Sequence, residues 1–173
     1  MNPVNLRSFK QKARHQKLAL KRFLSKVEKN PPEKLYSMMH TLDKEVWKEV
    51  DCLSCANCCK TMTPTFTIKD IKRIAAYLNM SPTAFRKKWL TYEKRDKDWV
   101  NSKQPCQFLD LQTNKCTIYP VRPADCAGFP HFKKKQPDLY MHVHQQNITY
   151  CPATFLLVKK MKDRLDKVSV TAS

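Results

Sequence analysis

The segment DCLSCANCCKTM, residues 51–62, places four cysteines within eight positions. They are Cys52, Cys55, Cys58 and Cys59. A spacing of three residues lets a tight loop aim successive sulfur atoms at one point, because three residues make almost one helical turn. The segment therefore predicts the nucleus of a metal site, and the rest of the chain is interpreted from it.

The other four cysteines lie far along the chain, at Cys106, Cys116, Cys126 and Cys151. The first three recur every ten residues, a spacing too long for local chelation, so the fold has to bring each of them to a site. Adjacent side chains diverge, so Cys58 and Cys59 are predicted to serve different groups. One completes the C-x2-C-x2-C nucleus and the other joins a group drawn from the distant cysteines. Eight thiolates are enough for two four-sulfur sites.

The cysteine pattern also bears on which metal is bound. A C-x2-C-x2-C run followed by distant cysteines is typical of iron–sulfur proteins, in which one loop supplies three thiolates of a cluster such as 4Fe–4S. Zinc sites more often show two separated C-x2-C pairs, and only one region of this chain is dense in cysteine. The pattern favours an iron–sulfur cluster, with zinc as the alternative because both accept four thiolates.

Composition limits the classes of function. The 173-residue chain carries 33 Lys and Arg against 15 Asp and Glu, a formal net charge of +18. This excess favours contact with a polyanion, and the alternative is a solvated basic surface without a specific partner. A single glycine, Gly128, cannot build the Gly-rich loops of nucleotide-dependent enzymes or of methyltransferases. We therefore expect a binding protein rather than an enzyme, and assign no catalytic residue.

Residues 1–32 are predicted to form a basic amphipathic helix that ends at Pro31 and Pro32. This helix either packs on the domain and displays lysines to water, or contacts a nucleic acid or a membrane surface. The candidate nucleic-acid contacts are Arg7, Lys10, Arg14, Lys17 and Lys21. The terminus lacks the apolar core of a secretory signal, and no stretch has the roughly 20 apolar residues of a membrane span. We expect a cytoplasmic protein with reduced cysteines; a mitochondrial presequence is the alternative.

Residues 33–173 are predicted to form one compact cysteine-rich domain, mainly α with a small β-hairpin. Helices are predicted over 33–50, 68–79, 82–91 and 153–167, with Thr67 and Ser81 as N-caps of the second and third. The hairpin is predicted over 106–116, with its turn at Asn114. Residues 94–103 are interpreted as an exposed loop and residues 130–150 as irregular.

Several residues near the cysteines have alternative roles. Arg122, which follows Tyr119 in the stretch IYPVRPADC, either donates hydrogen bonds to thiolates or cluster sulfides, or ties backbone carbonyls of its loop. Asp110 is expected at a turn rather than on a metal. His131 is a candidate extra ligand. His142 and His144 are expected on one face of a short extended segment, and a histidine that binds nothing is the alternative for all three.

The stretches CLSCANCC, PCQFLD and KCTIYPVRPADCAGFPHF, followed by Cys151, resemble the CxxCxxCC cysteine-cluster proteins, also called the YkgJ family. The resemblance covers about residues 50–152. It implies a small bacterial, cytoplasmic domain that binds zinc or an iron–sulfur cluster, and our first hypothesis for its role is structural, redox or sensing. Because a related domain occurs in the longer flagellin lysine N-methylases, an enzyme or enzyme accessory is one alternative. A nucleic-acid-associated module stabilised by metal is another.

Overall fold

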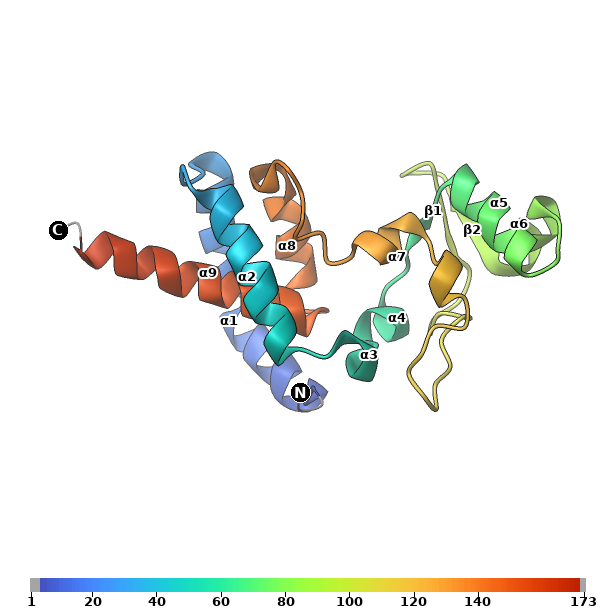
Figure 1. Ribbon diagram of the computed structural model, residues 1–173, viewed down its shortest axis with the longest axis horizontal. Helices are drawn as coiled ribbons and strands as arrows, with labels where there is room; N and C mark the ends of the chain where they lie inside the picture. Colours follow the sequence, from blue (N-terminus) through green and yellow to red (C-terminus); the bar gives the residue numbers. More distant parts are fainter. Residues whose placement is uncertain (1–3, 172–173) are drawn as a thin grey trace. The chain divides into compact units, whose positions relative to one another are not determined.

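The computed structural model describes residues 4–171, with side chains up to residue 167. The described chain is mainly helical with one small antiparallel sheet, as the sequence predicts (Figure 1). It forms two compact units. Unit 1 contains the described residues up to Cys55 and those from Pro130 onward, and unit 2 is Ala56–Phe129. The predicted basic helix is part of unit 1, with residues 1–3 outside the described range.

Unit 1 is a helical assembly. Its elements are α1 Leu6–Lys29, α2 Leu35–Glu49, α3 Cys52–Cys55, the 3-10 helix η2 Pro137–Tyr140, α8 Met141–Asn147 and α9 Pro152–Thr171. Helix α1 packs against α8 and α9, and α2 packs against α9. Phe9 of α1 meets Phe155 of α9 edge to face, with 5.9 Å between ring centroids. Within the described residues, no helix has the length and apolar character that crossing a membrane requires.

Helix α1 has a well-defined start and end. Asn5 is its N-cap, with a side-chain oxygen that accepts a hydrogen bond from the Ser8 amide at 2.9 Å. The helix ends at Lys29, just before the two prolines that the sequence predicts as its stop. Its buried residues follow helical periodicity and pack into unit 1: Phe9, Ala13, Leu20, Leu24 and Val27.

Unit 2 surrounds a separate aromatic and aliphatic core. Its elements are α4 Asn57–Thr61, β1 Thr65–Phe66, α5 Ile68–Tyr77, α6 Pro82–Trp89, β2 Leu90–Glu93, β3 Asp98–Asn101, the 3-10 helix η1 Tyr119–Val121 and α7 Ala124–Gly128. The sheet order is β1-β3-β2, and both pairs are antiparallel. Phe85 and Phe108 stack in this core with centroids 6.1 Å apart. This core supports the loops that carry the distant cysteines.

The predicted helix caps of unit 2 are confirmed. Thr67 and Asp70 form a complete capping box at the start of α5, because each side chain binds the backbone of the other. Ser81 caps α6, whose first residue is Pro82. Both signals lie within three residues of the helix start, so the sequence alone was sufficient to place them.

The sheet is not where the sequence places the hairpin. β2 and β3 form a hairpin that includes residues predicted to be an exposed loop, and Tyr92 lies opposite Trp99 with ring centroids 5.2 Å apart. Charged residues around these four-residue strands hide their alternation. In the predicted hairpin, the described backbone has one antiparallel bridge, Leu109 to Cys116, rather than a named strand pair. Its turn does contain Asn114, at a φ of 58° that asparagine tolerates well.

The prediction that residues 130–150 are irregular is wrong, because α8 and η2 lie there. His142 and His144 therefore do not share a face of an extended segment. Two residues along a helix point in nearly opposite directions. The His142 side chain is 60% exposed, and His144 is fully buried. The segment hides its helix because histidine, asparagine and valine are weak helix formers and burial in unit 1 stabilises it instead.

Candidate metal centre

The CLSCANCC motif forms two short helices. Cys52 and Cys55 stand at the two ends of α3, so they are separated by about one helical turn. The Asp51 carboxylate accepts a hydrogen bond from the Leu53 amide at 3.0 Å near the start of this turn. Ala56 then adopts a φ of 45°, in the left-handed region, and the chain continues into α4, which carries Cys58 and Cys59. A non-glycine residue in this conformation costs about 1 kcal/mol.

Backbone hydrogen bonds connect the motif to two distant cysteines within unit 2. The carbonyl of Cys59 accepts from the amide of Cys106 at 2.8 Å. The carbonyl of Cys106 accepts from the amide of Leu109 at 2.9 Å, and Leu109 bridges to Cys116. A continuous path of backbone contacts therefore links Cys59, Cys106 and Cys116, although Cys59 precedes the other two by more than forty residues of sequence.

Cys126 is brought to the same unit by two aspartates that anchor α7. Asp70, which is 1% exposed, accepts a hydrogen bond from the Ala124 amide at 3.2 Å. Asp125 accepts from the Thr65 amide at 3.1 Å. Arg73 donates to Asp70 at 2.7 Å and also to the carbonyl of Arg122 at 2.9 Å. The start of α7 is thereby fixed to α5 and β1.

These connections place four thiols near one another: Cys59, Cys106, Cys116 and Cys126, called here the four-thiol group. Burial raises the pKa of Cys126, and the charges of Cys59, Asp125, Cys106 and Cys116 raise it further. Burial also raises the pKa values of Cys106 and Cys116, to which the charge of Cys59 adds in both cases. Thiolates that repel one another in this way favour a cation among them, which would lower all four pKa values.

Cys59 is the thiol of this group that ionises most readily. Its sulfur lies 4.0 Å from that of Cys58. The hydrogen bond from Cys58 outweighs burial and lowers the pKa of Cys59 to about 7. At neutral pH this thiol is about half ionised, which suits a metal ligand.

Unit 1 holds a smaller set of cysteines. Cys151 lies directly before Pro152, the first residue of α9, and is buried like Cys55. Burial raises the pKa of Cys151, and the charge of Cys55 is a further, smaller cause. Cys52 is exposed. The structure thus brings Cys55 near Cys151, two residues that are far apart in sequence.

The thiols lie near one another, but they are not arranged around a common position that a metal ion could occupy. Within the described residues, no three Cys, His, Asp or Glu side chains stand in position to bind one metal ion. The chemistry of the four-thiol group nevertheless fits a metal centre, because all four donors are sulfur and each cysteine is partly buried.

Arg122 ties its own loop. Its guanidinium donates to the carbonyl of Tyr119 at 2.9 Å and lies 3.9 Å from the centre of the Tyr119 ring. The second of the two predicted roles is therefore observed. Its positive charge also lowers the pKa of Cys116, although burial outweighs this effect. Asp110 is a turn residue as predicted, since its carboxylate accepts from the Gln112 amide and the Thr113 hydroxyl.

The histidines lie in unit 1. His131 adopts a φ of 67° and packs near Tyr140, with 6.4 Å between ring centroids. His142 pairs with Glu28 at 3.9 Å. The structure gives His144 an apolar neighbour, Phe132, with ring centroids 5.8 Å apart. The roles of Asp70 and Asp125 in holding α7 were missed by the sequence reasoning, because only the capping box gives a local signal.

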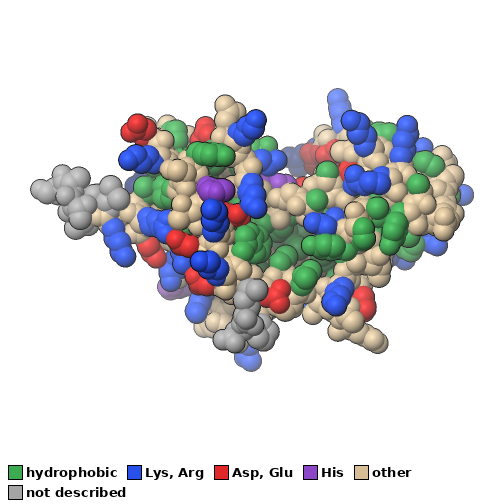
Figure 2. Space-filling model, viewed as in Figure 1, with side chains coloured by type: hydrophobic (Ala, Val, Ile, Leu, Met, Phe, Trp, Pro, Cys, Tyr) green, Lys and Arg blue, Asp and Glu red, His purple; other side chains and the backbone are tan. Residues whose placement is uncertain are grey.

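The candidate nucleic-acid contacts lie on α1. Arg7, Lys10, Arg14 and Lys17 are exposed, and Lys21 is half-buried. Figure 2 shows that lysine and arginine side chains are spread over the face in view rather than confined to one patch. These five residues therefore differ from the other lysines and arginines by their positions along α1, not by a higher local number of charges.

Comparison with known proteins gives a family match. Residues 51–152 match the family CxxCxxCC, described as "Putative zinc- or iron-chelating domain". An uncharacterised protein of Methanocaldococcus jannaschii is 31% identical over 123 residues, which is 67% of this chain and 64% of that protein. No solved structure matches the chain.

Proposed function

Because this chain belongs to the CxxCxxCC family of zinc- or iron-chelating domains, we propose that Cys59, Cys106, Cys116 and Cys126 hold an iron–sulfur cluster. The observation that carries the proposal is the four-thiol group itself, in which the charge of Cys59 raises the pKa of each of the other three thiols. Four thiolate donors suit an iron–sulfur cluster, and zinc, which also accepts four thiolates, is the alternative that metal analysis distinguishes. When bound, a cluster would supply one-electron redox chemistry.

The chain's own residues prepare this site in distinct ways. Cys58 donates to Cys59 and keeps one ligand close to ionisation at neutral pH. Arg122 offsets part of the negative charge at Cys116. Asp70 and Asp125 hold the helix that carries Cys126. In unit 1, Cys52, Cys55 and Cys151 are the candidates for a second centre.

The centre is proposed to be structural first. α4, the turn at 106–116 and α7 each contribute one or two of its ligands, and each is a short element with little core of its own. Binding energy at such a site adds directly to folding energy. The thiolate ligands require a reducing compartment, so the proposal includes a cytoplasmic location.

The test is metal analysis of protein purified without oxygen. We expect iron and sulfide to be bound and the protein to show broad visible absorbance. Stoichiometric zinc in a colourless protein would overturn the cluster but keep the thiolate centre, and protein with no metal would overturn both. Replacement of each member of the doublet by serine then tests the ligand set.

Cys59→Ser and Cys58→Ser are a matched pair, because the residues are adjacent in α4 and chemically identical. We expect Cys59→Ser and Cys126→Ser to lose the same fraction of bound metal. We expect Cys58→Ser to retain the metal that these two variants lose. Equal metal loss in Cys58→Ser and Cys59→Ser would contradict the assignment of Cys59 alone to the four-thiol group.

A further inference from the structure

Five basic residues of α1 form a straight row along the helix. Arg7, Lys10, Arg14, Lys17 and Lys21, called here the basic stripe, follow one another at spacings of three, four, three and four residues. Since an α-helix has about 3.6 residues per turn, this alternation keeps all five on one side. Lys21 lies 14 positions after Arg7, so the row spans about 21 Å at about 1.5 Å per residue.

The basic stripe has no acidic partner in the part of the chain that the structure describes. Within the described residues, none of its five side chains forms an ion pair or a hydrogen bond. Basic side chains of α9 behave differently, since Lys160 pairs with Glu49 at 2.8 Å and Arg164 pairs with Glu45. The one acid in α1, Glu28, lies at the far end of the helix and faces His142. The charge of the stripe is therefore left for an external anion.

The position of the stripe in α1 strengthens its positive field. The first turn contains no acidic residue, and Arg7 and Lys10 lie in the first two turns. Unpaired backbone amides give this end of a helix a partial positive charge, which repels cations and attracts anions. Arg7 and Lys10 therefore occupy positions at which carboxylates would stabilise the helix. A bound anion would reduce the repulsion between these cationic side chains and the start of the helix.

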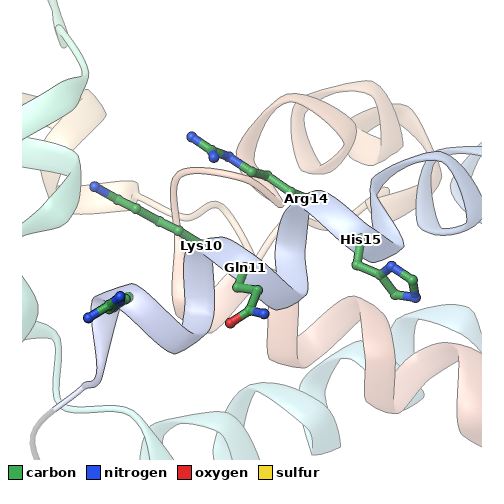
Figure 3. Close-up of a pocket in the computed structure, with 5 residues that line it drawn as sticks. Lys10, Gln11, Arg14 and His15 are labelled. Atoms are coloured by element: carbon green, nitrogen blue, oxygen red, sulfur yellow. The ribbon is translucent and has the colours of Figure 1, made fainter.

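An open depression adjoins the start of the stripe. It has a volume of about 790 Å³ and is lined by Arg7, Lys10, Gln11, Arg14 and His15. Figure 3 shows Lys10 and Arg14 extending from the same side of the helix, while His15 leaves it in a different direction. Two long cationic side chains that reach the same side can contact neighbouring anionic groups of one ligand.

A membrane surface does not fit this helix. An amphipathic helix that lies on a bilayer inserts an apolar face among the lipids. In α1 that face is already used, because Phe9 packs on Phe155 and both Leu20 and Leu24 are buried in unit 1. Leu18 is 68% exposed, but one side chain supplies little apolar area. The charged side chains of α1 are therefore what this helix offers to a ligand, in a row about 21 Å long.

We propose that the basic stripe binds the phosphodiester backbone of a nucleic acid without reading its base sequence. One strand of a duplex presents a phosphate about every 3.4 Å, so a row of about 21 Å faces about six phosphates. Flexible lysine and arginine side chains adjust to that spacing, and contacts to phosphates position a protein without specifying sequence. The stripe and the four-thiol group share no residue, because every residue of the stripe belongs to unit 1 and the four-thiol group belongs to unit 2.

The test uses the full-length protein and fluorescently labelled 20-mers of single-stranded RNA, single-stranded DNA and duplex DNA. The stripe variant carries Arg7→Gln, Lys10→Gln and Arg14→Gln. The matched control carries Lys12→Gln, Arg22→Gln and Lys26→Gln, which remove the same charge from exposed positions on other sides of α1. All six side chains are exposed, so both variants are expected to fold, and circular dichroism checks this.

Affinity is measured by fluorescence anisotropy over a salt series. The stripe variant should reduce the slope of log K against log salt by about 2 for single strands, since each lost phosphate contact contributes about 0.7. That reduction of the slope corresponds to a loss of affinity on the order of 100-fold at about 0.1 M salt. The affinity of the control variant should fall by less than about threefold. Comparison of the affinities for the three probes shows whether RNA or DNA is preferred.

Three results would overturn the proposal. Equal losses in the stripe variant and the control would show that total charge, rather than the row, determines binding. Absence of salt-dependent binding by the unmodified protein would remove the interaction altogether. Tighter binding to vesicles of phosphatidylserine and phosphatidylcholine than to any 20-mer, with the same sensitivity to the stripe variant, would assign the stripe to a lipid surface.

Discussion

His144 makes the stability of unit 1 sensitive to pH. Its side chain is fully buried in α8, and neither ring nitrogen has a hydrogen-bond partner within the described residues. Burial, with smaller effects from the charges of His131 and His142, lowers the pKa of His144 from 6.5 to about 4. The folded protein therefore holds this imidazole neutral at neutral pH.

The sign and size of the effect follow from the difference between the folded and unfolded pKa values. Between about pH 6.5 and about pH 4 the unfolded chain binds a proton that the folded chain does not, so stability falls as the pH falls through this window. The full difference corresponds to about 3 kcal/mol, of which about 2 kcal/mol is lost by about pH 5. Above about pH 6.5 the stabilising effect of the neutral state is fully present.

The perturbation is His144→Leu, which replaces the imidazole by an apolar group of similar size. Urea unfolding is followed by tryptophan fluorescence at about pH 7.5 and about pH 5. The unmodified protein should lose about 2 kcal/mol more than the variant between these pH values, a difference of about 1 M in urea midpoint at a typical slope. The variant should also be more stable at neutral pH, by about 1 to 3 kcal/mol, because two buried nitrogens without partners are removed.

Metal loss in acid does not confound the comparison. His144→Leu keeps all eight cysteines, so acid release of metal affects both proteins and cancels in the difference. His142→Leu is the matched control, since that side chain is 60% exposed on the same helix and its charge is only a smaller cause of the lowered His144 pKa, so this variant should keep most of the pH dependence. Equal losses of stability in the unmodified protein and in His144→Leu would refute the reasoning.

Two further substitutions test how the four-thiol group is held. Asp70→Asn should destabilise the protein by about 2 to 4 kcal/mol and reduce its metal content, because a buried carboxylate that accepts from Arg73 and Ala124 is lost; urea unfolding and metal analysis measure both, and unchanged metal content would contradict the anchoring role. Arg122→Gln should shift acid-induced metal release to higher pH, because it removes the charge that lowers the pKa of Cys116. Arg122→Lys should restore part of that shift in a metal-release titration, and identical curves for Gln and Lys would exclude a charge effect.

Local signals explain what the sequence predicts correctly about the fold. The capping box at Thr67 and the Ser81 cap depend on side chains three residues apart, and both are found where the sequence places them. The start of α1 and its stop before Pro31 are similarly local. Tertiary burial decides the cases that fail. α8 lacks a strong helical pattern, but it buries Met141 and His144 against the other helices of unit 1.

In the candidate site, too, local signals predict some features and tertiary packing decides the others. The spacing of the CLSCANCC motif indicates metal chemistry from sequence alone, and the family match agrees. The contact between Asp70 and Ala124 joins residues 54 apart, and that between Asp125 and Thr65 joins residues 60 apart. No periodicity in the sequence specifies such pairs. Their existence depends on how α5, β1 and α7 pack, which only the three-dimensional structure shows.

The adjacent cysteines raise the question of why two neighbouring thiols are present. Their sulfurs are 4.0 Å apart, about twice the length of a disulfide bond. Successive residues of a helix point about 100° apart, but the two sulfurs are nearly as close as two thiolates on one tetrahedral zinc, which are roughly 3.8 Å apart for Zn–S bonds of about 2.3 Å, so this distance does not by itself assign them to different ions. The hydrogen bond from Cys58 lowers the pKa of Cys59, so one thiol can prepare its neighbour as a ligand even where it does not bind the same metal. Because a serine hydroxyl still donates, Cys58→Ser removes the sulfur and keeps this hydrogen bond, whereas Cys58→Ala removes both. A difference between these two variants in metal retained by the four-thiol group would therefore measure the hydrogen bond alone.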